Sequence, residues 1–333
     1  MDENAELLAD PQWLPHRWMR DEGAVSFLKL DMDAFAQPMF LADRTANTAL
    51  ATRKVEATAV AQAPVTSGAL HFIFHTAFCR STLLVRALNI FGRSVGMNEP
   101  AILADCAGGH AIDHAFLTGV TRLLARPHGD ARTIFVKPTN LANRLIPTLM
   151  EIVPNAKAIC ISHDLRSFLN AINRRGLFGR DWVRKLYMQV QGYAPLDMCL
   201  DSRATFALTD MQVAGLVWML QRRWFTQNMA HFGAERMGSL DSDRFNKNRL
   251  GALAAVTDFV GAPMETDDLA KAIPADLFDQ HSKLGGDYAT RDRMERDKAS
   301  SAIFDEEAVM VGEWIANIMQ QAGLENTLAN PIM

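Results

Sequence analysis

Cysteine is scarce in this sequence and is not arranged for metal binding. The 333 residues include four cysteines, Cys79, Cys106, Cys160 and Cys199, and these form no CxxC motif and no Cys/His pair at the spacing of metal ligands. So few thiols in a long chain are typical of a reducing compartment. We therefore expect no metal.

The sequence also lacks a large net charge and long apolar runs. The chain has 34 Lys and Arg against 38 Asp and Glu, a formal net charge of −4, so it lacks the basic footprint of general nucleic-acid binding. No apolar run approaches the length of a membrane span. The first residues, MDENAELLAD, are acidic and lack the basic-then-apolar layout of a signal peptide. These absences predict a cytoplasmic globular protein with no nucleic-acid partner and no membrane span.

The sequence does contain alternating strand and helix patterns. Apolar runs of strand length occupy residues 70–75, 133–139 and 156–164, and a helical periodicity follows each of them. RSVGMNEP and MGSLDSDRF each contain a further short strand candidate. This alternation predicts an α/β fold with a central, mostly parallel sheet.

Helices are expected in three further stretches, and the chain divides at residue 70. The alanine-rich residues 46–62 read as a helix, as do residues 111–125 and the long amphipathic stretch 211–233. We expect residues 1–69 to form an N-terminal segment that packs on a main domain, 70–333. A charged, glycine-containing loop near 276–300 would form a surface loop or lid.

Polar residues gather at the predicted strand ends, in HTAFCRST, KPTN and SHDLRS. Ligands of parallel sheets bind at the carboxyl ends of the strands. In the first of these turns Arg80 offers a charged fork, and Ser81 and Thr82 offer hydroxyl groups at a helix start, where anions bind. The alternative is an ordinary helix cap with a solvated arginine. The turn is not a Walker A loop, because only Thr82 fits GxxxxGK[ST].

HFIFHTAFCRSTLLVRAL resembles the phosphosulfate-binding loop of the sulfotransferases, often written PRSGTTLL or PKSGTTW. FVKPTNLANRLIPTLMEIVPNAKAICISHDLRSFLNAI is similar to the next block of that family, and DSDRFNKNRLGALAAVTDFVGAP to a later one, so the resemblance spans residues 70–265. It implies a divergent member of bacterial type, with a P-loop-type three-layer sandwich and added helices. It also implies 3′-phosphoadenosine 5′-phosphosulfate (PAPS) as co-substrate without a metal. The acceptor would be a small molecule or a peptide, and the oligomeric state stays open.

The resemblance also implies roles for individual residues. Glu99, nineteen residues after Arg80, would be the general base, since Thr139 stands at the other family position for a base and cannot serve. His75 is a third candidate because of its own place at the strand end, apart from the resemblance. Lys137 would neutralise the bridging oxygen of the donor. The residues expected to bind the cofactor are Phe78, Cys79, Arg80, Ser81 and Thr82 at the phosphosulfate, and His163, Arg166 and Ser167 near the 3′-phosphate.

Several positions depart from the family pattern. The loop lacks the family glycine, His163 stands where the family has an arginine, and Ala171 stands where it has a serine. HSKLGGDYATRDR is only weakly similar to the late RKG…GDW loop of the family. Two alternatives therefore stay open. One is a P-loop transferase with another phosphate donor, such as a kinase-like enzyme, and the other is a non-catalytic accessory protein that kept the fold.

Overall fold

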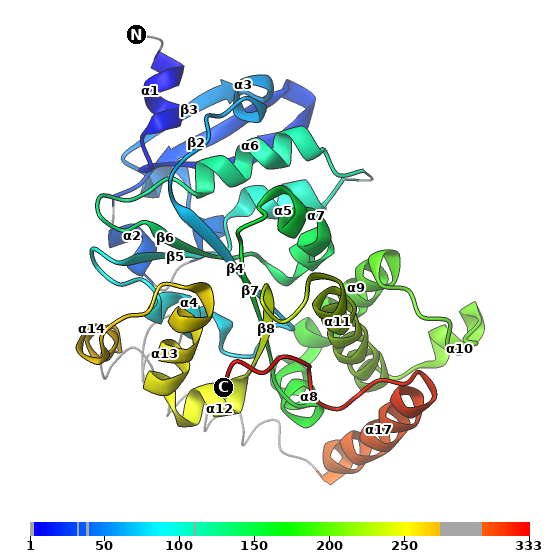
Figure 1. Ribbon diagram of the computed structural model, residues 1–333. Coiled ribbons are helices and arrows are strands. Elements are labelled where there is room, and N and C mark those ends of the chain that lie inside the picture. The colour runs from blue at the N-terminus through cyan, green and yellow to red at the C-terminus, as the bar shows by residue number, and fades with distance from the viewer. Residues whose placement is uncertain (1–2, 32, 38–39, 110, 274–301) are drawn as a thin grey trace.

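The computed structural model describes residues 3–31, 33–37, 40–109, 111–273 and 302–333 (Figure 1). Its centre is a five-stranded sheet in the order β5-β6-β4-β7-β8, and every neighbouring pair is parallel. The strands are β4 (Ala69–His75), β5 (Ser94–Asn98), β6 (Thr133–Lys137), β7 (Ala158–Ser162) and β8 (Met237–Asp241). The predicted α/β class with a parallel sheet is confirmed, and all five strand candidates form strands.

Strand alternation sorts the sheet side chains onto two apolar faces. Ile73, Phe135 and Ile159 pack on one face, against α4 (Ser81–Ala87), α12 (Ser242–Lys247), α13 (Arg249–Val260) and α14 (Thr266–Lys271). Phe72 and Val136 point to the other face. Its helices are α5 (Ala101–Ala107), α6 (His114–Leu124), α7 (Ile146–Ile152) and α11 (Asp210–Phe232). The predicted three-layer sandwich is therefore confirmed.

The connections change faces beside β4. The chain leaves β4 through α4 on one face, whereas β6 continues through the 3₁₀ helix η4 (Asn140–Leu145) and α7 on the opposite face. Connections that diverge in this way leave a crevice at the carboxyl ends of the strands, where ligands bind in such folds. The topology therefore predicts a ligand-binding site at the carboxyl ends of β4 and its neighbouring strands.

The N-terminal residues form a separate antiparallel sheet in the order β1-β2-β3. The helix predicted over residues 46–62 is wrong for 51–56, which form an edge strand that pairs along its whole length with β2. In that range α-helix is confined to 57–61, and a 3₁₀ turn covers 46–48. The elements are α1 (Glu3–Ala9), β1 (Trp13–Met19), η1 (Arg20–Glu22), β2 (Ala24–Lys29), α2 (Asp33–Ala36), η2 (Leu41–Asp43), η3 (Ala46–Thr48), β3 (Ala51–Glu56) and α3 (Ala57–Ala61). Side chains of this sheet and of the central sheet share one apolar cluster.

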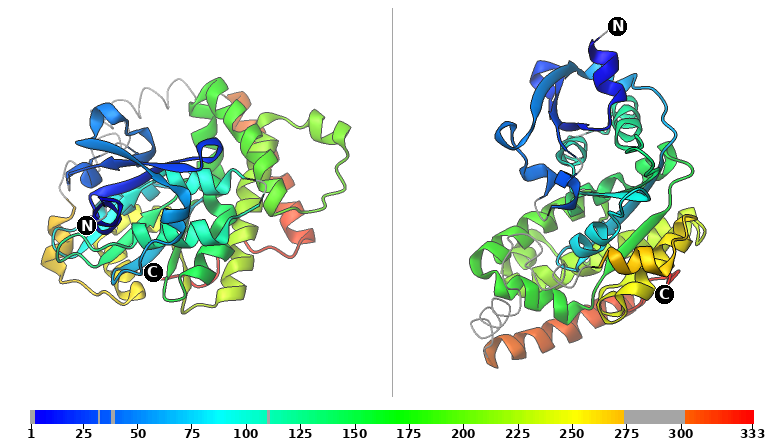
Figure 2. Two further views of the ribbon diagram at one scale, coloured as in Figure 1. Left: turned by 90° about the horizontal axis from the view of Figure 1, so that it is seen from above. Right: turned by 90° about the vertical axis from the view of Figure 1, so that its left-hand side faces the viewer.

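A second group of helices lies beyond β7, around the predicted long helix α11 (Figures 1 and 2). It consists of α8 (Leu165–Arg174), α9 (Gly176–Tyr193), α10 (Ser202–Ala207) and α17 (Ala302–Gln321), and all of these except α10 contribute to one buried apolar cluster. Gly215 permits the close approach of α11 to α17, because a Cβ atom there would lie 2.7 Å from Ile315 Cγ1. None of the helices described is long and apolar enough to cross a membrane. The predicted lid near 276–300 lies outside the described residues.

Candidate functional site

The turn between β4 and α4 has a left-handed backbone without glycine. The φ angles are 70° at Ala77, 55° at Phe78 and 61° at Arg80. This region of φ is unfavourable for residues with a Cβ atom, by roughly 1–2 kcal/mol each. Such a backbone persists only where its surroundings hold it in place, and positions of this kind cluster at functional sites. The turn must therefore be anchored by its side chains and amides.

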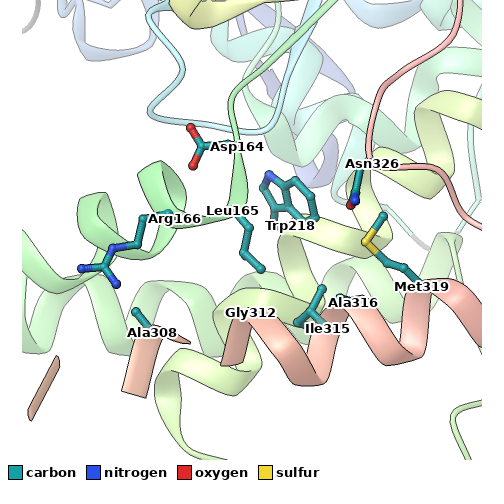
Figure 3. Close-up of a pocket in the computed structure, with 10 residues that line it drawn as sticks. All are labelled: Asp164, Leu165, Arg166, Trp218, Ala308, Gly312, Ile315, Ala316, Met319 and Asn326. Carbon is teal, nitrogen blue, oxygen red and sulfur yellow. The ribbon is translucent and has the colours of Figure 1, made fainter. Parts of the chain in front are cut away.

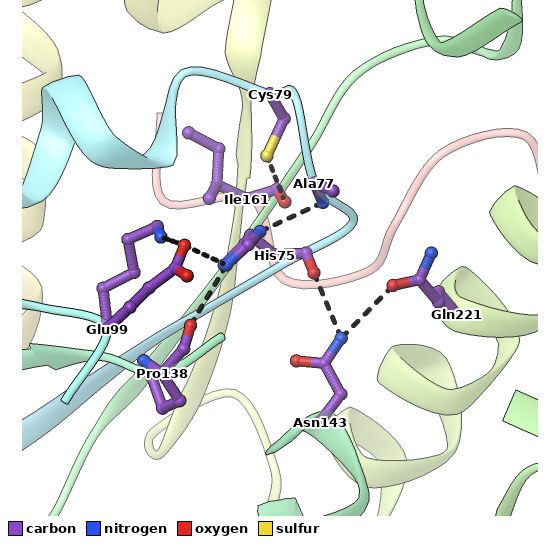
Figure 4. A network of polar contacts seen from close by, with 9 residues as sticks. His75, Ala77, Cys79, Glu99, Pro138, Asn143, Ile161 and Gln221 are labelled. Carbon is purple, nitrogen blue, oxygen red and sulfur yellow. Dashed lines mark hydrogen bonds and ion pairs between the residues drawn. The ribbon is translucent and has the colours of Figure 1, made fainter. Parts of the chain in front are cut away.

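His75 is the first of these anchors (Figure 4). Its Nδ1 accepts a hydrogen bond of 3.0 Å from the Ala77 amide, and its Nε2 lies 3.1 Å from the carbonyl oxygen of Pro138. Because Nδ1 is the acceptor, the proton of the neutral ring is on Nε2 and is donated to Pro138. Both ring nitrogens are thus engaged, and the geometry gives His75 an orienting role.

Phe78 and Cys79 anchor the middle of the turn. The Cys79 thiol donates to the carbonyl oxygen of Ile161 at 3.3 Å, and burial raises its pKa, so the sulfur stays protonated. The ring of Phe78 lies 5.0 Å from that of Trp182, and the guanidinium of Arg175 covers it at 3.7 Å. These two predicted binding residues therefore fix the turn against β7 and the α8–α9 helices.

Arg80 ends the turn and points toward the far edge of the sheet. Its Nη1 donates to Ser242 Oγ at 3.0 Å and to Asp243 Oδ1 at 2.8 Å, at the start of α12. Its charge is therefore already paired. Ser81 and Thr82 form the buried first turn of α4, where backbone amides have no carbonyl partner within the helix. An anion at this turn would meet these amides and hydroxyls.

The three predicted catalytic residues lie together at the ends of neighbouring strands. Lys137, the last residue of β6, has a side chain only 1% exposed and forms an ion pair with Glu99 Oε1. The same oxygen lies 4.0 Å from His75 Nε2 (Figure 4). Glu99 has a φ of 54°, and its side chain is 18% exposed. Strand alternation places Lys137 and His75 on the α4 face, so this cluster lies on the side of the sheet where α4 begins.

The residues predicted near the 3′-phosphate have different surroundings. Burial lowers the pKa of His163 to about 4, so the ring is neutral, and neither ring nitrogen has a hydrogen-bond partner among the described residues. Arg166 forms an ion pair with Asp305 of α17. Ser167 donates both its amide and its hydroxyl to Asp164, each at 2.8 Å. Burial disfavours the Asp164 carboxylate, but these hydrogen bonds outweigh it and lower its pKa. Of these three residues, His163 is the one whose buried polar atoms have no partner in the part of the chain that the structure describes.

Several polar residues at the same edge were given no individual role by the sequence, although Thr76 and Asn140 stand in its HTAFCRST and KPTN strand ends. Buried polar atoms without a partner in the described structure belong to Thr76, Asn98, Asn140 and Asn143, which follow or end β4, β5 and β6. A buried polar group left unpaired is unfavourable by about 1–3 kcal/mol, so a concentration of them indicates a place for a bound molecule or ordered water. An asparagine directly after an apolar strand was the available signal. The described residues contain no group of three His, Cys, Asp or Glu side chains that could hold a metal ion.

Comparison with known proteins gives matches only among solved structures. No family model and no curated protein matches the sequence. The sulfotransferase domain from the curacin biosynthetic pathway aligns with a TM-score of 0.40 and 15% identity over 79% of this chain and 99% of that one. The sulfotransferase from Alicyclobacillus acidocaldarius gives 0.38 and 14%, over 76% of this chain and 97% of that one. The sulfotransferase domain from the Synechococcus PCC 7002 olefin synthase gives 0.42 and 13%, over 76% and 96%. We transfer no residue role from these three proteins.

Proposed function

We propose that this chain is a sulfotransferase that moves a sulfuryl group from PAPS to a hydroxyl or amine acceptor, a small molecule or a peptide. The observation that carries the proposal is the buried Lys137–Glu99 pair on the face where α4 begins, at the edge of the sheet where Thr76 and Asn98 have buried polar atoms without a partner among the described residues. A buried cation beside free helix amides suits a polyanionic donor. The sequence resemblance over residues 70–265 supports the same assignment.

Glu99, Lys137 and His75 have different roles in the proposed sulfuryl transfer. The acceptor oxygen or nitrogen forms a bond to sulfur, and the bond between sulfur and the bridging phosphate oxygen breaks. Glu99 receives the acceptor proton through Oε2, because Oε1 is the oxygen paired with Lys137. The electron pair of the broken bond stays on the phosphate, where Lys137 and the α4 amides stabilise the negative charge. His75 holds the turn in position.

A donor without a 3′-phosphate is the second candidate, and one observation favours it. Two of the three residues expected at a 3′-phosphate are committed elsewhere, Arg166 to Asp305 and Ser167 to Asp164, and burial keeps His163 neutral. A kinase-like transferase with a nucleoside triphosphate would need none of these contacts.

Calorimetric titration with PAP, the product nucleotide, beside ADP and ATP, with and without Mg²⁺, separates the two candidates. Micromolar binding of PAP without Mg²⁺ supports the sulfotransferase. Lys137→Met should weaken it at least tenfold, because a buried charge next to the phosphate is lost. Lys185→Met is the matched control, since Lys185 is 71% exposed and forms its ion pair with Asp181.

The alternative results reject the proposal in distinct ways. Binding of ATP with Mg²⁺ but not of PAP identifies the kinase-like alternative, and no nucleotide binding identifies the accessory protein. If PAP binds, Glu99→Gln should leave binding within a few-fold of the parent and lower the rate of sulfuryl transfer by 10²–10⁴, the usual contribution of a general base. An unchanged rate would exclude Glu99 as the base.

A further inference from the structure

A pocket of about 340 Å³ lies between α8, α11 and α17 (Figure 3). It follows β7, so β4 separates it from β6, which ends at Lys137. Leu165 and Trp218 line one side of it, and Gly312 and Ile315 of α17 line the other. The indole N–H of Trp218 is donated to the carbonyl oxygen of His163 at 2.9 Å, so the ring gives the pocket an apolar surface. A volume of this size is in the range of small-molecule sites.

Asp164 and Arg166 are the charged residues that line this pocket, and only one of them is compensated. Arg166 is neutralised by the carboxylate of Asp305. Asp164 accepts hydrogen bonds only from the neutral amide and hydroxyl of Ser167, and it has no ion-pair partner in the described part of the chain. Those two bonds leave further lone pairs of its carboxylate open. The pocket thus combines an apolar floor with Asp164, an exposed residue whose carboxylate has no ion-pair partner in the described part of the chain.

We infer that this pocket binds a small molecule with an apolar, aromatic or alkyl body and a protonated amine, with the body between Trp218 and Ile315 and the amine at Asp164. An ammonium group supplies donors and the opposite charge, which Asp164 lacks among its present partners. The Trp218 ring adds attraction for an apolar ring, while the guanidinium of Arg222 already lies 4.6 Å from its centroid, so the cation is held by Asp164 and not by the indole. A ligand carboxylate would be repelled by Asp164 and would have to displace Asp305 from Arg166.

The inference does not depend on the reaction proposed above. The pocket follows β7, whereas Lys137 ends β6, Glu99 follows β5, and β4 lies between β6 and β7. Arg166, which the sequence predicts near the 3′-phosphate, also lines this pocket. Binding can therefore be measured without any donor nucleotide, and its failure leaves the sulfotransferase proposal intact.

The test uses three probes of one shape and different charge: 3-phenylpropylamine, 3-phenylpropanol and 3-phenylpropionate, titrated into the full chain by calorimetry at pH 7. We expect the amine to bind at one site at least tenfold more tightly than the alcohol, and the carboxylate to bind more weakly than the alcohol. Asp164→Asn should bring the amine and the alcohol within about twofold of each other. Asparagine is also a good helix N-cap, so α8 should keep its start.

A second variant fills the pocket. A Cβ atom at Gly312 would meet no atom within 4 Å, so Gly312→Phe can place its ring in the pocket without a backbone clash, and it should abolish binding of the amine. The matched controls are Gly192→Phe, at another open helical glycine, and Asp201→Asn, at the N-cap of α10. Both should bind the amine as the parent does.

Three results would overturn the inference. They are the absence of amine binding at millimolar concentration, equal binding of the three probes, and amine binding that survives Gly312→Phe. Equal binding would identify an apolar void without charge preference. Survival in Gly312→Phe would place the amine elsewhere. If Gly312→Phe does not fold, the response to Asp164→Asn decides alone, because a loss of amine preference supports the site and an unchanged preference rejects it.

Discussion

Breaking the Lys137–Glu99 pair should destabilise the fold far more than breaking an exposed pair. Lys137 is 1% exposed, so Glu99→Gln leaves a buried ammonium without its carboxylate, and we expect a loss of about 3–5 kcal/mol in the free energy of unfolding. Lys137→Met leaves a carboxylate that is 18% exposed and partly hydrated, so its loss should be smaller, about 1–3 kcal/mol. The double variant removes both charges. It should be more stable than the sum of the single losses predicts, by about 2–3 kcal/mol.

Urea denaturation followed by circular dichroism at pH 7 measures these differences. The matched control is the cycle of Lys185→Met and Asp181→Asn, whose side chains are 71% and 63% exposed. Its coupling should be at most about 0.5 kcal/mol, as for other solvated pairs. A coupling of Lys137 and Glu99 no larger than that of the control would refute the reasoning, because it would mean that Lys137 is hydrated or neutral in the folded chain.

Three further changes test other parts of the molecule. The buried Arg126 donates to the carbonyl oxygens of Leu7 and Leu8 at the end of α1, so Arg126→Met should lose about 2–3 kcal/mol and speed amide exchange in residues 3–9. Gly215→Val would force α17 away from α11, and we expect a lower thermal midpoint from a loss of about 1–3 kcal/mol. His163 has a pKa of about 4 in the fold against an ordinary value of 6.5, so between these values the unfolded chain binds the extra proton and stability falls as the pH is lowered. Its share of the loss from pH 7 to pH 5 is about 2 kcal/mol, and stability measured at both pH values should show a smaller difference in His163→Gln; an equal difference would contradict this.

The central sheet could be predicted because its strands are buried on both faces. Runs such as LHFIFH and TIFVK are mostly apolar, and their flanking helices have a clear period, so sequence alone locates them. The polar strand ends follow from the same pattern, since the first residues outside an apolar strand lie at the edge of the sheet. The strand pattern therefore brings Lys137 and His75 to one edge of the sheet, whereas Glu99 was singled out by the family resemblance.

The N-terminal sheet could not be predicted, because its edge strand resembles a helix. Four of the six residues of ATRKVE are exposed, and Val55 alone is buried, so the strand lacks the alternation of a half-buried strand. Its alanine, arginine, lysine and glutamate are good helix formers. Pairing with β2 overrides this local preference, and such pairing depends on residues far away in the sequence.

The partner toward which a long side chain points could not be predicted from the sequence either. Arg80 stands at a helix start beside two hydroxyl residues, which favours an anion ligand, but its guanidinium is paired with Asp243, 163 residues later. Gln221, in the middle of α11, shares a hydrogen bond with Asn143 and reaches the carbonyl oxygen of Thr76. No local pattern marks such a residue, because its role depends on where α11 crosses the sheet.

The turn after β4 shows why glycine is dispensable there. Glycine would allow the left-handed backbone at Ala77, Phe78 and Arg80 without strain, but it would also leave the unfolded and open forms of the turn more freedom. This chain holds the same backbone by contacts: the Ala77 amide on His75, the Phe78 ring under Arg175, and Arg80 on Asp243. The strain is offset by interactions that also fix the direction of the amides. An anion that binds at α4 therefore meets donors already in position, and little ordering of the turn is needed on binding.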